Sequence, residues 1–292
     1  MTTPVASCWW LAERLDDPDI RVVDTRWYLL EPGEGRQQYE KGHIPGAVFL
    51  DLDTDLSAPT GPGRHPLPAA GDFGALMGRH GIGNHHHVVV YDQGPGSIAA
   101  RLWWMLRSAG HGEVSVLDGG YGRWTAEGHP TTADGPEYPQ APFKVSRDFT
   151  PTIDRHSLRD RLGTVQVIDA RPADRYRGEN ETVDPAAGHI PTSISAPTDG
   201  NLGRDGLFKS PDLLARRFAD LGVDPGVPVV SSCGSGVTAC HNIIALVLAG
   251  WPEATLYPGS WSDWSTAGFP VATGAEPGTS TGAPAESSAP PP

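Results

Sequence analysis

The chain has 292 residues, of which 38% are hydrophobic and 20% charged. This length exceeds the size at which a single hydrophobic core usually stops growing, so two domains are expected. The composition argues against a disordered chain, and no apolar run approaches the roughly 18 residues that would span a bilayer. The net charge of −13 argues against nucleic acid or a membrane surface as a partner.

Three cysteines are present, Cys8, Cys233 and Cys240. An odd and sparse set fits a reducing compartment and a reactive thiol better than a disulfide framework. The first 17 residues contain no basic region followed by an apolar core, so we expect no signal peptide. These features predict a cytoplasmic protein.

The first half of the chain predicts an alternation of strands and helices. A buried strand is expected at residues 22–26 (VVDTR), followed by HIPGAV at residues 43–48. Residues 89–110 predict a strand, a tight loop and a helix, and a glycine-led segment follows at residues 119–124. Such an alternation favours a parallel sheet covered by helices.

The second half repeats these segments in the same order. VIDAR at residues 167–171 and HIPTSI at residues 189–194 follow their counterparts by 145 or 146 residues. Residues 229–250 and 259–264 follow theirs by 140 residues. Self-similarity at one long period, over several segments, indicates a duplicated domain.

The domain boundaries are predicted from composition. We expect a first domain at residues 1–130 and a second at 153–272. Residues 131–152 contain four prolines and predict an extended linker. Residues 273–292 are rich in Gly, Pro, Ser, Thr and Ala, which predicts a disordered tail.

Cys233 stands where the predicted strand of the second repeat ends. Ligands of a parallel α/β sheet bind at the carboxyl ends of its strands. Gly234 and Gly236 can adopt backbone conformations closed to other residues, so the loop N–H groups can point inward and bind an anion. At the start of a helix, such a loop favours a thiolate. We therefore predict that Cys233 is a nucleophile, whereas Cys240, inside the helix, is structural.

Two other positions help to decide which reaction the chain catalyses and which domain carries the nucleophile. A cysteine phosphatase would carry an arginine six residues after the nucleophile, where this chain has Ala239. Small residues in the loop therefore favour sulfur transfer. The position that matches Cys233 in the first half is Gln93, so the first domain is predicted to lack a nucleophile and to complete the cleft.

Adjacent histidines at residues 85–87 predict a solvated turn rather than a metal site, because they lack ligand spacing.

At CGSGVTAC (residues 233–240) and GSWSDW (residues 259–264) the chain resembles the tandem-domain rhodanese family, in particular its 3-mercaptopyruvate sulfurtransferase branch. The resemblance extends over about residues 8–272. It implies an α/β fold of two tandem rhodanese-like domains, each a parallel sheet flanked by helices. It also implies a sulfurtransferase that needs neither a metal nor an organic cofactor.

The resemblance also suggests how an anionic donor is held. Arg175, within DARPADRYRG at residues 169–178, is similar to the arginine that holds the donor's carboxylate or sulfonate. Members of this branch often carry a second arginine shortly before the GHIP motif, where this chain has Asp184. The second anion contact is therefore missing or supplied from elsewhere. Arg171 and Arg177 are expected to serve structure.

A proton relay is implied by the same resemblance. In the mercaptopyruvate branch an aspartate, a histidine and the loop serine have been proposed to form it, and the matching residues are Asp53, His65 and Ser235. The aspartate would fix the histidine tautomer, and the serine would protonate the enolate leaving group. The alternative is that Asp53 caps a turn and His65 only closes the wall of the cleft.

These observations predict a two-step sulfur transfer. The Cys233 thiolate attacks the donor's sulfur and becomes a persulfide, which the loop amides of Gly234, Gly236, Val237 and Thr238 stabilise while Arg175 holds the donor. A thiol acceptor, such as thioredoxin or a small thiol, or cyanide then takes the outer sulfur.

We favour 3-mercaptopyruvate as the donor. Gly234 and Ser235 replace the Arg-Lys pair that the thiosulfate branch places in its loop, and a neutral loop with a hydroxyl suits a leaving group that needs a proton. The alternatives are a thiosulfate:cyanide sulfurtransferase, a non-catalytic persulfide carrier, and a cysteine phosphatase or arsenate reductase.

Overall fold

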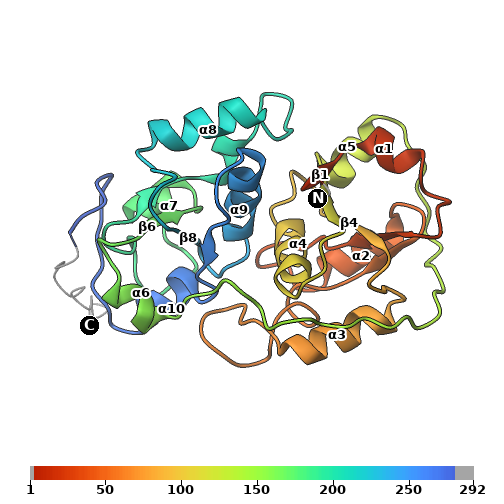
Figure 1. Ribbon diagram of the computed structural model, residues 1–292, viewed down its shortest axis with the longest axis horizontal. Helices are drawn as coiled ribbons and strands as arrows, with labels where there is room; N and C mark the ends of the chain where they lie inside the picture. Colours follow the sequence, from red (N-terminus) through yellow and green to blue (C-terminus); the bar gives the residue numbers. More distant parts are fainter. Residues whose placement is uncertain (1–2, 280–292) are drawn as a thin grey trace.

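Two separate parallel sheets organise the residues that the computed structural model describes, 3–279 (Figure 1). The first sheet has the strand order β1-β5-β4-β2-β3 and the second the order β7-β6-β8-β9. All strand pairs within them are parallel. The predicted architecture, two tandem α/β domains that are each built on a parallel sheet flanked by helices, is confirmed.

The first domain contains β1 (Val5–Ala6), α1 (Cys8–Ala12), β2 (Ile20–Asp24), α2 (Glu34–Lys41), β3 (Ala47–Phe49), α3 (Ala70–Arg79), β4 (His87–Tyr91), α4 (Ala99–Ser108), β5 (Val114–Leu117) and α5 (Gly120–Ala126). The second contains α6 (Arg155–Asp160), β6 (Gln166–Asp169), α7 (Ala173–Arg177), β7 (Ile194–Ser195), the 3₁₀ helix η1 (Thr198–Asn201), α8 (Pro211–Asp220), β8 (Val229–Ser232), α9 (Ala239–Leu248), β9 (Thr255–Leu256) and α10 (Ser260–Thr266).

The central strands are short, apolar and buried, as expected where helices cover both faces of a parallel sheet. In β4, Val88, Val89 and Val90 are fully buried, and in β6 so are Val167 and Ile168. β4 and β8 occupy corresponding places in the two sheets, each beside the strand that opens its repeat, β2 or β6. The duplication seen in the sequence is therefore a duplication of strand order.

Helices α4 and α9 face each other where the domains meet (Figure 1). Each follows the loop after the corresponding strand, β4 or β8, and nearly all its residues are buried. A helix buried on nearly every side must be covered by other elements, and here each helix packs on its own sheet and on the other helix. One continuous hydrophobic cluster therefore includes Trp103 of α4 and Ile243 of α9.

The predicted linker contains no helix or strand and lies along the first domain (Figure 1). The N–H of Ala141 donates to the Gly78 carbonyl, and the N–H of Ser146 donates to that of Ala109. None of the helices within residues 3–279 has the length and hydrophobicity that crossing a membrane requires.

The start of the predicted disordered tail is ordered. Gly274 N–H donates to the Arg177 carbonyl, and the Pro277 carbonyl accepts from Thr192 N–H. These backbone bonds fix residues 273–277 against the second domain, which composition alone did not indicate. Residues 280–292, the end of the predicted tail, lie outside the described residues.

Candidate active site

Cys233 is the first residue after β8, and its backbone is fixed by the start of α10. Its N–H donates to the Ser260 hydroxyl at 3.0 Å, and its carbonyl accepts from the Trp261 N–H at 2.9 Å. The residue is only 1% exposed. Cys8, Cys233 and Cys240 are all buried and free of disulfides.

Gly236 is the residue that turns the loop back onto the sulfur. Its N–H donates to Cys233 Sγ at 3.1 Å. Its φ of +74° is left-handed, and a Cβ built there would lie 2.3 Å from the Pro258 carbonyl oxygen. The unusual backbone conformation was predicted, and the close approach of Pro258 is a second reason why this position requires glycine.

Gly234 has a different role from the one predicted. Its φ does not lie in the left-handed range. A Cβ there would instead lie 2.8 Å from Nη2 of Arg64 and 3.8 Å from Nη1 of Arg175. Gly234 therefore provides room for two guanidinium groups. Among the predicted amide donors within the described chain, Gly236 alone donates a hydrogen bond to Sγ. Val237 is buried, and Thr238 is the N-cap residue of α9.

The corresponding loop of the first domain binds a carboxylate of its own chain. Asp92 Oδ1 accepts from the N–H groups of Gly94 and Gly96, and Oδ2 accepts from those of Ile98 and Ala99. Gly96 has a φ of +89°, similar to that of Gly236. Since the two loops descend from one duplicated sequence, the occupied loop supports an anion-binding character for the one around Cys233.

The three residues of the predicted relay lie in one hydrogen-bonded line across the two domains. His65 Nδ1 lies 2.7 Å from the Ser235 hydroxyl, and its Nε2 lies 3.1 Å from Asp53 Oδ1. The other carboxylate oxygen of Asp53 accepts from Trp27 Nε1 at 2.8 Å. An ionised Asp53 places the proton of neutral His65 on Nε2, so Nδ1 is left to accept from Ser235.

The surroundings keep His65 uncharged. Burial lowers its pKa below the usual 6.5, and Asp53 only partly offsets this, while Arg101 lowers it further. Arg101 comes from α4, is fully buried, and donates to the carbonyls of Gly236 (3.1 Å) and His65 (3.0 Å). This arginine therefore ties the nucleophile loop to the histidine and places a positive charge near both.

Arg175 lies beside Gly234, the residue after Cys233, and two carboxylates already hold it. Its Nη2 donates to Glu181 at 2.8 Å and to Asp184 at 3.2 Å, and its Nε donates to Glu181. Burial opposes ionisation of Glu181, yet the bond from Arg175 and the N–H groups of residues 183 and 184 lower its pKa. Nη1 and Nη2 of Arg175 lie 3.8 and 4.0 Å from the position that a Cβ on Gly234 would occupy, and of its three guanidinium nitrogens Nη1 alone has no hydrogen bond within the described residues.

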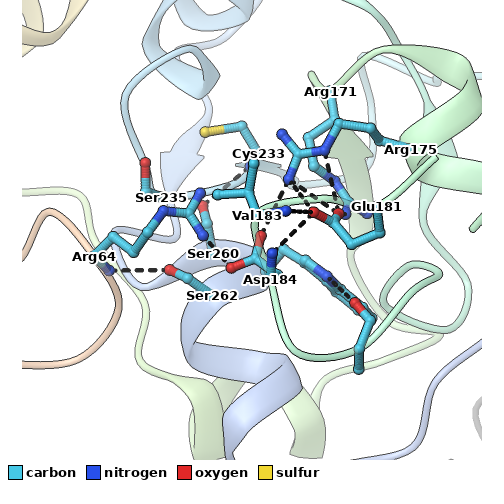
Figure 2. Close-up of polar contacts among 12 residues, drawn as sticks. Arg64, Arg171, Arg175, Glu181, Val183, Asp184, Cys233, Ser235, Ser260 and Ser262 are labelled. Atoms are coloured by element: carbon cyan, nitrogen blue, oxygen red, sulfur yellow. Dashed lines mark hydrogen bonds and ion pairs between the residues drawn. The ribbon is translucent and has the colours of Figure 1, made fainter. Parts of the chain in front are cut away.

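Arg64 also belongs to this cluster, and sequence reasoning missed it. It pairs with Asp184 from the side opposite Arg175 (Figure 2). Its backbone N–H donates to the Ser262 hydroxyl at 3.1 Å. Two signals pointed to it: Arg64 directly precedes the relay histidine, and Asp184 stands where an arginine was expected.

The remaining predictions concern structural groups. Arg171 is buried and pairs with Asp169 at 2.8 Å, in keeping with a structural role. His86 is buried, and its Nδ1 accepts from the Gly83 N–H at 2.8 Å, so the expected solvated turn is wrong at this residue because the ring completes the turn. No cluster of His, Cys, Asp or Glu able to hold a metal ion occurs within residues 3–279.

Comparison with known families places these features in context. The model of the rhodanese-like domain matches residues 7–127 and again residues 154–267.

Similar proteins span nearly the same length. A probable 3-mercaptopyruvate sulfurtransferase of Pseudomonas aeruginosa is 45% identical over 272 residues, which cover 90% of this chain and 96% of that protein. A thiosulfate sulfurtransferase of Rattus norvegicus is 39% identical, covering 87% and 89% of the two chains. The crystal structure of SseA, a 3-mercaptopyruvate sulfurtransferase of Escherichia coli, superposes with a TM-score of 0.79 at 37% identity, covering 89% of this chain and 100% of that one.

Proposed function

This chain belongs to the rhodanese family and is a sulfurtransferase, and from that premise we propose that it moves sulfur from 3-mercaptopyruvate to a thiol or cyanide through a persulfide on Cys233. The observation that carries the choice of donor is the line from Ser235 through His65 to Asp53, because it provides a proton relay beside the nucleophile loop.

The first half-reaction forms an S–S bond and breaks a C–S bond. The Cys233 thiolate attacks the thiol sulfur of 3-mercaptopyruvate, and the C–S electron pair passes to carbon as the enolate of pyruvate. The thiol proton passes through the Ser235–His65 pair to that carbon, so pyruvate leaves and an anionic persulfide remains. The Gly236 N–H, which donates to Sγ, stabilises negative charge there.

The second half-reaction regenerates the thiolate. A thiol, such as that of thioredoxin or a small thiol, or cyanide attacks the outer sulfur of the persulfide. The S–S bond then breaks, and its electron pair returns to Cys233. Such a scheme gives ping-pong kinetics. We expect the reaction to take place in the cytoplasm, in keeping with three unpaired cysteines.

Thiosulfate is the second candidate donor, because relatives named thiosulfate sulfurtransferase are 37–39% identical to this chain. Sulfite leaves thiosulfate as a stable anion and needs no proton from a relay. A relay of three aligned groups is therefore better explained by a donor that leaves as an enolate.

Intact mass spectrometry tests the proposal. Incubation with 3-mercaptopyruvate is expected to add one sulfur atom to Cys233, to release pyruvate, and to be reversed by cyanide or a reductant. C233S should show neither result, whereas C240A should show both. Cys240 provides the matched control because it lies seven positions further on, fully buried, where burial raises its pKa far above that of a free thiol. Wild-type protein that gains no sulfur would refute the proposal, and sulfur loading without turnover would identify a carrier.

A further inference from the structure

Two guanidinium groups, one from each domain, converge beside the nucleophile. Nη2 of Arg64 and Nη1 of Arg175 are the atoms nearest to the position that a Cβ on Gly234 would occupy, at 2.8 and 3.8 Å. Nη1 of Arg64 and Nη2 of Arg175 pair with the carboxylate of Asp184, which lies between the two groups (Figure 2). The ends directed at Gly234 are thus the ones available to an anion.

Arg64 is held in this place on both its backbone and its side chain. The backbone is fixed by the bond from its N–H to Ser262 in α10. The preceding Gly63 has a φ of +78°, and a Cβ there would lie 2.6 Å from the Gly259 carbonyl oxygen, so the segment is pressed against the second domain. Asp184, whose side chain is 2% exposed, fixes the guanidinium.

We propose that Arg64 binds the anionic end of the sulfur donor together with Arg175, and that Asp184 is the positioning residue that holds Arg64. The donor site would then span both domains, with the first supplying the second arginine. This inference rests on the proposed function for the identity of the donor, a 2-oxo carboxylate carrying a thiol on carbon 3.

The charges of the cluster suit a singly charged donor end. Arg64 and Arg175 bring two positive charges, and the nearly buried carboxylates of Glu181 and Asp184 bring two negative ones. The four side chains therefore sum to zero charge. One carboxylate can bind to the two free guanidinium ends by charge-assisted hydrogen bonds. A dianion gains less here than at an uncompensated pair of arginines.

Binding is measured in a C233S background, which blocks the chemistry. Calorimetric titration with 3-mercaptopyruvate, and separately with thiosulfate, gives Kd for each variant. R64A is expected to raise the Kd for 3-mercaptopyruvate about tenfold, since one charge-assisted hydrogen bond is lost. The Kd of R64K should lie between those of the parent and R64A, because an ammonium group keeps the charge but cannot donate two parallel hydrogen bonds to a carboxylate. The control R79A removes an exposed arginine of α3 and should leave Kd unchanged.

A double variant separates binding from a structural role. R64A leaves Asp184 without one of its two partners, which alone could disturb the site. R64A/D184N removes that uncompensated charge. If Arg64 binds the donor, the double variant stays as weak as R64A. Recovery of the parental Kd in the double variant, or a parental Kd in R64A itself, would overturn the inference.

The two donors keep this test distinct from that of the proposed function. A parent that binds thiosulfate but not 3-mercaptopyruvate refutes the proposed donor, while the effect of R64A on thiosulfate binding still decides the role of Arg64. A parent that binds neither donor refutes both proposals.

Discussion

The Nδ1 atom of His65 in the first domain lies 2.7 Å from the hydroxyl oxygen of Ser235 in the second. The two residues are 170 positions apart in the chain, and the contact depends on how the two domains pack, with α4 against α9 at the boundary. The nucleophile and the residues that serve it therefore come from different copies of one duplicated unit.

Removal of the Ser235 hydroxyl should affect the two donors differently. With S235A, we expect kcat for 3-mercaptopyruvate to fall about a hundredfold, since the relay no longer reaches the enolate. Transfer from thiosulfate should change little, because sulfite leaves without a proton. Steady-state rates with both donors check this, with S265A as control, since the Ser265 hydroxyl has no hydrogen-bond partner within the described residues. An equal loss with both donors would contradict the relay.

The pH dependence of the reaction should report on His65. Burial lowers the pKa of this ring below 6.5, so the neutral form that accepts a proton persists below that pH. The acidic limb of kcat/KM for 3-mercaptopyruvate should therefore lie below pH 6.5, with activity lost as pH falls through the pKa of the folded protein. Asp53 raises this pKa, so D53N should move the limb to lower pH as well as slow the reaction. A limb that stays in place in D53N would assign it to another group.

Arg101 should speed the reaction by positioning the nucleophile loop and His65, without touching the donor itself. Its two hydrogen bonds hold the carbonyls of Gly236 and His65, and its charge lies near Cys233. We expect R101M to slow pyruvate release in a single turnover about tenfold, with partial rescue by R101K. R107M is the matched control, because Arg107 lies on the same helix and also crosses the domain boundary, where it pairs with Glu253. Similar losses in both variants would point to a general loosening of the domains.

Alanine at Gly236 should lower the stability of the protein, whereas alanine at Gly234 should mainly weaken use of the donor. G236A places a side chain at a left-handed φ and against a backbone oxygen, so we expect a loss of about 2 kcal/mol or more in the free energy of unfolding. G234A clashes with no backbone atom and presses on the terminal nitrogen of the long Arg64 side chain, so its stability should stay within about 0.5 kcal/mol of wild type while KM for the donor rises. Denaturant unfolding and steady-state kinetics on both variants test this contrast.

Much of the fold could be predicted from the sequence because the repeat exposes it. Short β-branched segments return at a fixed spacing, and each precedes a glycine loop and an apolar helix. The place of Cys233 at a strand end follows from that pattern alone. The identity of the relay residues came from family resemblance, whereas their alignment depends on how the domains dock.

Features that depend on distant contacts could not be predicted. Arg64 meets Asp184 across 120 positions and a domain boundary, so neither residue reveals the other in a linear scan. Composition marks residues 273–277 as tail, although the acceptors and donors that fix them lie on the second domain. For Gly234, the sequence shows that glycine is present but not whether conformation or space requires it.

In the first copy, the carboxylate of Asp92 occupies the loop that corresponds to the one around Cys233, in the place where a bound anion would lie. The first copy therefore lacks a nucleophile, and four amides of its loop are already engaged. Gln93→Cys alone would place a thiol beside N–H groups that already donate to Asp92. Two separate substitutions would therefore be needed, one to supply a cysteine and one to remove Asp92, before this loop could hold an anionic sulfur.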